Sequence, residues 1–243
     1  MTLGPIPDYL KNAMRGHFLS GLKDHRSLET YELDLFRWFR NESEETWARM
    51  DAEEQTYIQE QIASGAEEIN DSGMVAADYY RKRMRSSHAI FLASLLESTM
   101  KKECDRLSIA LGKQILFEPS ELKGDPWSAR KIFLERHGSF QVPGDLWNPI
   151  KGLLAVRNAL VHHGGETSLL TTEQTTTLGK ISGVDVTRSE VGLEAIYVEQ
   201  ASQAVRNLME FIHDCTNAVI DRAKRPQFQL RAMRVSMSSS KRP

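Results

Sequence analysis

The sequence predicts a mainly α-helical, soluble globular protein. In several long segments, apolar residues recur every three or four positions, as one face of a helix requires. Glycine and proline gather between those segments, where they end helices. Hydrophobic residues make up 40% of the 243 residues and charged residues 26%, a composition typical of a globular protein.

The N-terminal part predicts a helical extension after an irregular start. Residues 1–27 contain several prolines and glycines, which disfavour regular structure. A helix is expected over residues 28–39, where the apolar positions keep helical spacing. Asn41 or Ser43 could cap a second, acidic helix that continues to about residue 69.

Four further helices are expected in the remainder of the chain, over residues 75–111, 127–136, 146–163 and 199–223. The first ends at Gly112, a residue type that favours helix termination. Its core-facing stripe consists of Leu92, Leu96, Met100, Cys104, Leu107 and Leu111.

A small β-hairpin is expected between the last two helices. Residues 166–198 are rich in threonine, glycine and β-branched residues. Two short apolar runs, over residues 180–186 and 193–198, are the candidate strands.

We therefore expect three parts: an N-terminal helical extension over residues 1–72, a helical domain over residues 73–225, and a basic, disordered tail over residues 226–243.

Charge is uneven although the net charge is only −2. Ten acidic residues and one basic residue lie between Glu42 and Asp71, whereas seven basic residues and no acidic one follow from Arg222 onward. Residues 81–85 form a second basic cluster. Either basic region could guide an RNA backbone or simply face solvent. The acidic segment could cover a basic surface, bind a partner or face solvent.

Several classes of protein are disfavoured. The only two cysteines, Cys104 and Cys215, lie in apolar helical patterns, which indicates buried thiols rather than a disulfide framework or a metal site. The histidines lack metal-ligand spacing, so no metal and no cofactor is expected. No signal peptide or membrane-spanning run is evident, and a cytoplasmic location without membrane contact is the expectation.

The strongest candidate site lies at the end of the helix expected over residues 146–163. Arg157, Asn158 and His162 occur there in order, and His163 and two glycines follow. Arginine can hold a phosphate, and histidine can move a proton near neutral pH.

Helical geometry raises two questions about these residues. Arg157 falls on the apolar face that Leu146, Ile150, Leu153, Leu160 and Val161 define, so it needs a compensating partner. Glu97 occupies a similar apolar position and is the partner we expect. Arg157 and His162 are about 140° apart on an ideal helix. They would meet if the helix ends or distorts at His162, or if a second copy supplies one of them.

Structural roles compete with this interpretation. An arginine on an apolar helix face is more often one member of an ion pair than a catalytic group. A histidine in the last turn of a helix also interacts favourably with the exposed carbonyl groups there.

The pattern Arg157-Asn158-x-x-x-His162 resembles the signature of the HEPN (higher eukaryotes and prokaryotes nucleotide-binding) domain superfamily. The branched residue before the histidine and the glycine after it are also similar. Upstream, residues 89–107 resemble the first core helix of that family, and residues 199–223 its closing helix. The resemblance covers about residues 75–223 and implies a HEPN-like helical bundle.

The resemblance implies a metal-independent endoribonuclease whose composite site lies at a homodimer interface. His162 would assist the attack of the RNA 2′-hydroxyl, Arg157 would hold the phosphate, and Asn158 would position one of them. His163 is a rival base, and Glu97 a supporting residue. Roles in defence, as a toxin or in RNA processing fit such an activity, with an antitoxin-like protein as a possible partner.

Two other functions stay open at this point. A non-catalytic HEPN-like module could bind RNA, a nucleotide or a protein through the same groove. A helical dimer with a structural role is the third interpretation, in which Arg157 only pairs with Glu97.

Overall fold

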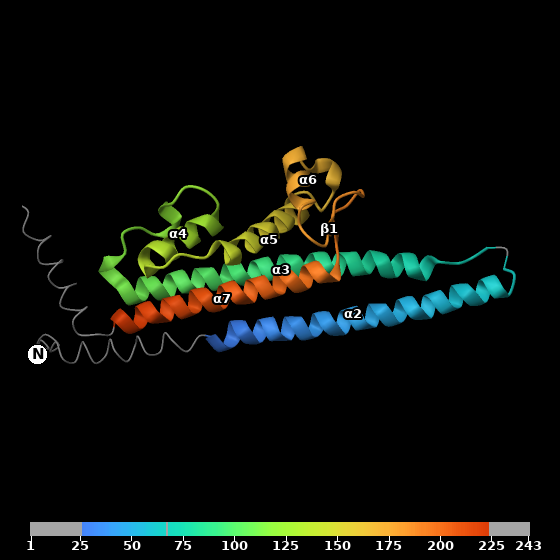
Figure 1. Ribbon diagram of the computed structural model, residues 1–243, viewed down its shortest axis with the longest axis horizontal. Coiled ribbons are helices and arrows are strands. Elements are labelled where there is room, and N and C mark those ends of the chain that lie inside the picture. Colours follow the sequence, from blue (N-terminus) through green and yellow to red (C-terminus); the bar gives the residue numbers. More distant parts are fainter. Residues whose placement is uncertain (1–25, 67, 224–243) are drawn as a thin grey trace, which may run out of the picture. The chain divides into compact units, whose positions relative to one another are not determined.

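The protein is described by a computed structural model that covers residues 26–66 and 68–223 (Figure 1). The chain divides into two compact units, which we describe one at a time. Unit 1 contains residues 26–30, 96–143 and 208–223, and unit 2 contains residues 31–95 and 144–207. The irregular start and the basic tail expected from the sequence lie outside the described residues.

The mainly α-helical fold and the small antiparallel hairpin are both confirmed. The long elements are α2 (Arg26–Ala63), α3 (Ser72–Leu111), α4 (Pro126–Gly138), α5 (Gly144–His162), α6 (Thr172–Leu178) and α7 (Ala195–Ala223). Strand β1 (Val184–Asp185) pairs with β2 (Gly192–Leu193), with Val184 opposite Leu193. Single 3₁₀ turns occupy Gly112–Gln114, Pro119–Glu121 and Thr167–Leu169.

The two helices expected before residue 70 are one continuous helix, α2, so the predicted break at Asn41 or Ser43 is wrong. The Ser43 hydroxyl donates to the Phe39 carbonyl at 2.7 Å, and the Asn41 side chain accepts from Arg40. Both residues therefore bond along an uninterrupted helix instead of capping a new one. Helix α2 also contains no glycine or proline that could end it.

The inserted segment contains more helix and less strand than expected. Helix α6 begins with a capping box, in which the Gln174 amide nitrogen donates to Thr171 Oγ1 at 3.2 Å and the Thr171 amide to Gln174 Oε1 at 2.8 Å. The second apolar run is a strand only at its first residue, Leu193, because α7 begins at Ala195. The strands of two residues each are shorter than the apolar runs that predicted them.

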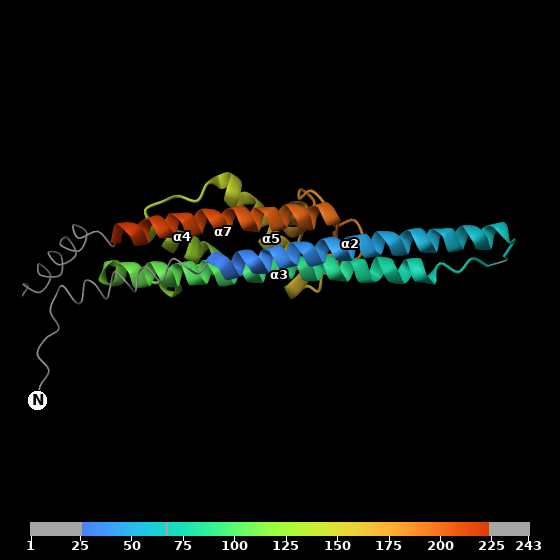
Figure 2. The same cartoon turned by 90° about the horizontal axis from the view of Figure 1, so that it is seen from below.

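Unit 2 is built around the packing of α2 against α3, which lie side by side in both views (Figures 1 and 2). Phe36 of α2 stacks on Phe91 with ring centroids 5.2 Å apart and meets the edge of the buried His88 at 5.1 Å. Salt bridges reinforce this contact: Glu44 pairs with Arg85 at 2.5 Å, and Asp51 pairs with Arg81. The acidic helix therefore does cover part of the basic cluster, as one of the sequence interpretations proposed.

Unit 1 has an aromatic core. Phe133 of α4 is fully buried and lies 4.7 Å from His137 and 6.2 Å from Phe117, measured between ring centroids. Phe140 meets the edge of Phe211 on α7 at 5.8 Å. Burial lowers the pKa of His137, because its imidazole is packed between phenylalanine rings rather than in water.

A buried polar cluster also connects α3 with α7 in unit 1, and the sequence analysis did not find it. Arg106 donates to both carboxylate oxygens of Glu103 at 2.7 and 2.6 Å. His213 Nδ1 lies 3.0 Å from Glu103 Oε1, and Arg106 also donates to Asn217. Glu103 and Arg106 are each only 4% exposed. Removing a charge from water is costly, so Glu103 and Arg106 remain charged inside the protein only while their hydrogen-bonding partners stay in place.

The protonation of Glu103 follows from these contacts. Burial by itself would raise the pKa of this carboxyl, but the hydrogen bond from His213 and the positive charge of Arg106 outweigh it. The pKa is therefore held below its usual value of 4.5. The ionised form of Glu103 is the one that stabilises the fold.

The Glu103→Gln variant tests the importance of the buried cluster. This change leaves Arg106 buried without its counter-charge, so the free energy of unfolding should fall by about 3–5 kcal/mol in urea titrations. Glu97→Gln is the matched control, because the Glu97 side chain is 41% exposed and its ion pair should contribute only about 0–1 kcal/mol. Equal losses for the two variants would contradict this role of burial.

Acid unfolding should also depend on Glu103. Because its pKa is lower in the folded protein, its contribution to stability is complete above about pH 4.5 and is lost as the pH falls through the folded-state pKa. The melting temperature of the wild type should drop over that range. The melting temperature of Glu103→Gln should vary less steeply there, and parallel curves for the two proteins would be inconsistent with this account.

Candidate functional site

Helix α5 of unit 2 carries the candidate residues, and its buried face sets their direction. That face consists of Trp147, Ile150, Leu153, Val156 and Ala159. The buried face is therefore rotated about the helix axis relative to the apolar face expected from the sequence: Val161 is 44% exposed, and Leu146 and Leu160 are only partly buried. Arg157 consequently lies at the edge of the buried face, not in its middle.

The end of α5 is closed by two glycines. Gly164 and Gly165 have φ angles of 61° and 81°, the left-handed region that glycine adopts without strain. The Ala159 carbonyl accepts from the amides of His163, at 3.2 Å, and Gly165, at 3.1 Å. This turn ends the helix at His162, so the His162 side chain stands at the last helical position and is exposed.

Arg157, Asn158 and His162 form one exposed cluster. Nη1 of Arg157 donates to Asn158 Oδ1 at 3.0 Å and lies 3.2 Å from His162 Nε2. The separation of about 140° between the two backbone positions is thus overcome within a single chain. The long arginine side chain reaches around the helix to the terminal histidine, so a second copy is not required to bring these two groups together.

The contact between Arg157 and His162 determines the form of the imidazole. A guanidinium group has N–H donors and no acceptor, so Nε2 of His162 must present its lone pair. Nδ1 then carries the proton of the neutral ring. In the part of the chain that the structure describes, Nε and Nη2 of Arg157 have no protein acceptor and are open to an anion.

Glu97, the residue expected to pair with Arg157, has a described partner in its own unit. Glu97 accepts instead from Arg130 of α4 at 3.1 Å, within unit 1. Both residues were expected on apolar faces, but Glu97 flanks the buried face of α3, as Arg157 flanks that of α5. Each has polar partners in its own unit: Arg130 for Glu97, and Asn158 and His162 for Arg157.

His163 is placed differently from His162. Its side chain is partly buried, and its described hydrogen bonds are made by the backbone: the amide donates to Ala159, and the carbonyl accepts from Glu166 at 2.9 Å. No described side-chain bond joins His163 to Arg157 or Asn158. His162, rather than His163, is therefore the histidine in contact with Arg157.

The basic cluster on α3 is largely neutralised. Arg81 pairs with Asp51, Lys82 with Asp78, Arg83 with Glu190 at 2.9 Å and Arg85 with Glu44. Its four charges are therefore matched by four carboxylates, and the cluster offers little net attraction for a nucleic acid. The basic residues after Arg222 lie outside the described residues.

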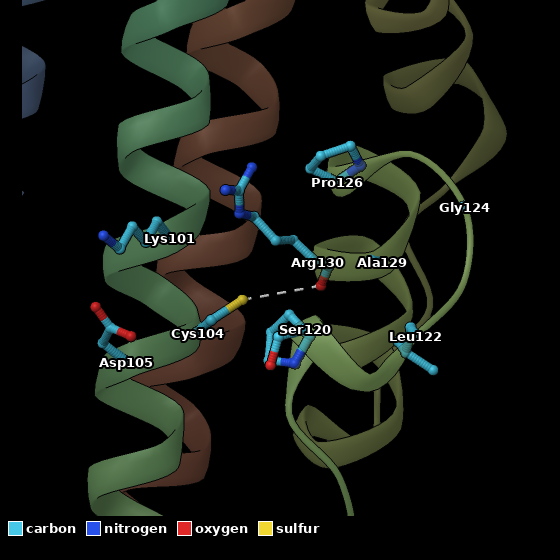
Figure 3. Close-up of a pocket in the computed structure, with 10 residues that line it drawn as sticks. Lys101, Cys104, Asp105, Ser120, Leu122, Gly124, Pro126, Ala129 and Arg130 are labelled. Carbon is cyan, nitrogen blue, oxygen red and sulfur yellow. Dashed lines mark hydrogen bonds between the residues drawn. The ribbon is translucent and has the colours of Figure 1, made fainter.

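Unit 1 contains a pocket of about 400 Å³ between α3, the Pro119–Glu121 turn and α4 (Figure 3). Cys104 lies in its wall, and its sulfur is directed toward the Arg130 carbonyl, 3.9 Å away. Burial raises the pKa of the Cys104 thiol to about 12, so it remains protonated at neutral pH and is a poor nucleophile. The pocket therefore offers no reactive thiol.

Within the described residues, no helix is both long and apolar enough to cross a membrane, and no three His, Cys, Asp or Glu side chains gather as metal ligands. Comparisons of the chain with protein-family models, curated proteins and solved structures found no match.

Proposed function

We propose that the protein is a metal-independent endoribonuclease of HEPN type that cleaves RNA at the end of α5. The observation that supports this most strongly is the exposed contact between the Arg157 guanidinium and the lone pair of His162 Nε2, 3.2 Å apart. The cluster thus combines a donor for phosphate oxygens with an acceptor for a proton. RNA supplies the matching groups, a phosphate and a neighbouring 2′-hydroxyl.

The reaction is an internal transfer at phosphorus. Nε2 of His162 takes the proton from the 2′-hydroxyl, and the 2′-oxygen forms a bond to the adjacent phosphorus. The bond from phosphorus to the 5′-oxygen breaks, and that oxygen takes up a proton. The products are a 2′,3′-cyclic phosphate and a 5′-hydroxyl end. DNA lacks the 2′-hydroxyl and is not a substrate.

In this proposal, Arg157 binds the phosphate. Its Nε and Nη2 groups form the free side of the guanidinium fork, which suits two phosphate oxygens. Charge on those oxygens increases in the transition state, where fixed donors stabilise it most. Binding of phosphate also draws the guanidinium away from His162, which frees Nε2 to accept the proton.

A second copy of the chain supplies the remaining group. One imidazole cannot take the proton from the 2′-hydroxyl and protonate the leaving 5′-oxygen in the same step. A homodimer in which two α5 ends face each other provides two histidines for one phosphate: the neutral imidazole of one copy takes the proton from the 2′-hydroxyl, and the protonated imidazole of the other copy gives a proton to the leaving 5′-oxygen. The exposure of Asn158, Val161 and His162 on this side of α5 is compatible with such a site.

Cleavage of labelled single-stranded RNA in the presence of EDTA tests the proposal. His162→Ala should lower the rate about 10²–10⁴-fold, the usual effect of removing a placed base. Arg157→Ala should lower it about 10²–10³-fold because it removes transition-state charge stabilisation.

His163→Ala and Glu97→Gln are the matched controls, and both should cleave at a rate close to that of the wild type. RNA binding without cleavage by the wild type would favour the non-catalytic module instead. Neither binding nor cleavage would leave only a structural role.

Substitution of Asn158 by aspartate and by alanine distinguishes the effect of its amide group from the effect of its size. Asn158→Asp keeps an oxygen that accepts from Arg157, but it adds a negative charge beside the phosphate site. We expect KM for RNA to rise more in Asn158→Asp than in Asn158→Ala, because the carboxylate competes with phosphate for the guanidinium. Steady-state kinetics measure this, and a larger effect of alanine would mean that the amide acts directly on substrate.

A further inference from the structure

The contact between α2 and α3 in unit 2 encloses a histidine without a hydrogen-bond partner. His88 of α3 is only 5% exposed, and neither of its two buried ring nitrogens has a partner among the described residues. Its imidazole is packed against the rings of Phe36 and Phe39 on α2, with centroids 5.1 and 5.9 Å away. This environment favours the neutral imidazole, because burial removes a charge from water and supplies no acceptor for its N–H groups.

A buried cation faces His88 from α2. Arg40 is 7% exposed and acts on the imidazole as a positive charge. Its described hydrogen bonds go only to the neutral amide oxygen of the next residue. Helix α7 adds another cation to this part of unit 2, Arg206, which pairs with Asp34 of α2. A protonated His88 would thus stand beside a second positive charge in a region closed to water.

One carboxylate of α2 favours the protonated form of His88, but it is already engaged. Arg85 of α3 donates to both oxygens of Glu44, at 2.7 and 2.5 Å. Burial lowers the pKa of His88 most strongly, Glu44 raises it in part, and Arg40 and Arg85 lower it again. The pKa of His88 therefore lies below its ordinary value of 6.5, and the imidazole is neutral at pH 7.

The same contact covers two arginines of α3. Arg85 pairs with Glu44 and Arg81 pairs with Asp51, so carboxylates of α2 match both guanidinium groups. The two arginine side chains are only 16% and 20% exposed. If α2 separates from α3 at this point, both arginines lose these counter-charges and become accessible to another anion.

We propose that residues 31–51 of α2 form an acid-sensitive cover over α3, which opens when His88 takes up a proton and then exposes Arg81 and Arg85 to a polyanion such as a nucleic acid. The proposal does not depend on the ribonuclease activity, because none of these residues lies at the end of α5.

The open form of the cover binds the proton more tightly than the closed form. In the open form His88 faces water and its pKa returns to about 6.5, whereas burial keeps it lower in the closed form. Above pH 6.5 the imidazole is neutral in both forms, and the contact keeps its full stability. Between about pH 7.5 and 5.5, protonation of the open form alone raises the opening equilibrium constant about tenfold.

Hydrogen exchange of the full-length protein tests the opening. Exchange of the backbone amides in residues 31–51, corrected for the intrinsic exchange rate at each pH, gives the opening equilibrium constant. We expect this constant to rise about tenfold from about pH 7.5 to 5.5 in the wild type. In His88→Phe, which keeps an aromatic ring against α2 but cannot take up a proton, it should stay the same. Equal rises in the two proteins would overturn the proposal.

Two further measurements keep this test specific. His137→Phe is the matched control, because it removes a buried imidazole of unit 1 and should leave the rise in residues 31–51 as it is in the wild type. Loss of the rise in this control would overturn the proposal. The imidazole signals of the wild type, followed by NMR, provide a test that needs no variant to fold. A His88 signal that titrates at about 6.5 without opening of the cover would also overturn it.

Binding of a DNA oligonucleotide tests whether the arginines are exposed. If DNA binds only the open form at this surface, its apparent affinity follows the opening equilibrium constant. The wild type should bind DNA about tenfold more tightly than His88→Phe at about pH 5.5, and equally at about pH 7.5. His162 and His163 are present in both proteins, so their protonation cancels in the comparison. Arg81→Gln with Arg85→Gln should remove the gain, and equal binding by the wild type and His88→Phe in acid would contradict the proposal.

Discussion

The contact between Arg157 and His162 depends on how α5 ends. The buried face from Trp147 to Ala159 fixes the rotation of the helix in unit 2. Gly164 and Gly165 then turn the chain back, so that the Gly165 amide reaches the Ala159 carbonyl at 3.1 Å. With the helix stopped at this point, the terminal imidazole stands where a long arginine side chain can reach it. A side chain with a Cβ at either glycine would strain this turn, because both φ angles are positive.

Hydrogen-bond partners distinguish the arginine of the candidate site from the buried Arg106. The guanidinium of the buried Arg106 donates to Glu103 and Asn217 inside the protein. Arg157 is only partly buried, and its described bonds use only Nη1, so Nε and Nη2 have no protein acceptor among the described residues. The same type of residue is therefore structural in one place and able to bind a ligand in the other. Solvent access and unused hydrogen-bond donors make the difference.

The sequence predicted helices that correspond to α3, α4, α5 and α7, and the glycine stop after α5. It also placed Arg157, Asn158 and His162 near the end of α5 but left open how they would meet. It misjudged features that depend on a neighbouring helix. Glu103 and Arg106 are three residues apart, but nothing in the sequence indicates that His213 packs against them. The angular argument also left out the length of the arginine side chain, so it required either a helix that ends or distorts at His162 or a second copy to bring the two groups together. The sequence does contain a helix-start signal for α6, because Thr171 lies three residues before Gln174, as a capping box requires. The threonine-rich composition of this segment obscured it.

Analysis of the RNA ends produced by the wild-type protein in EDTA tests the central claim most directly. Attack by the 2′-hydroxyl leaves a 2′,3′-cyclic phosphate on one fragment and a 5′-hydroxyl on the other, which mass spectrometry distinguishes. The account predicts these ends from RNA, and no cleavage of a DNA oligonucleotide of the same sequence. Fragments with a 5′-phosphate, or cleavage of the DNA, would contradict it, because water rather than the 2′-hydroxyl would then be the nucleophile.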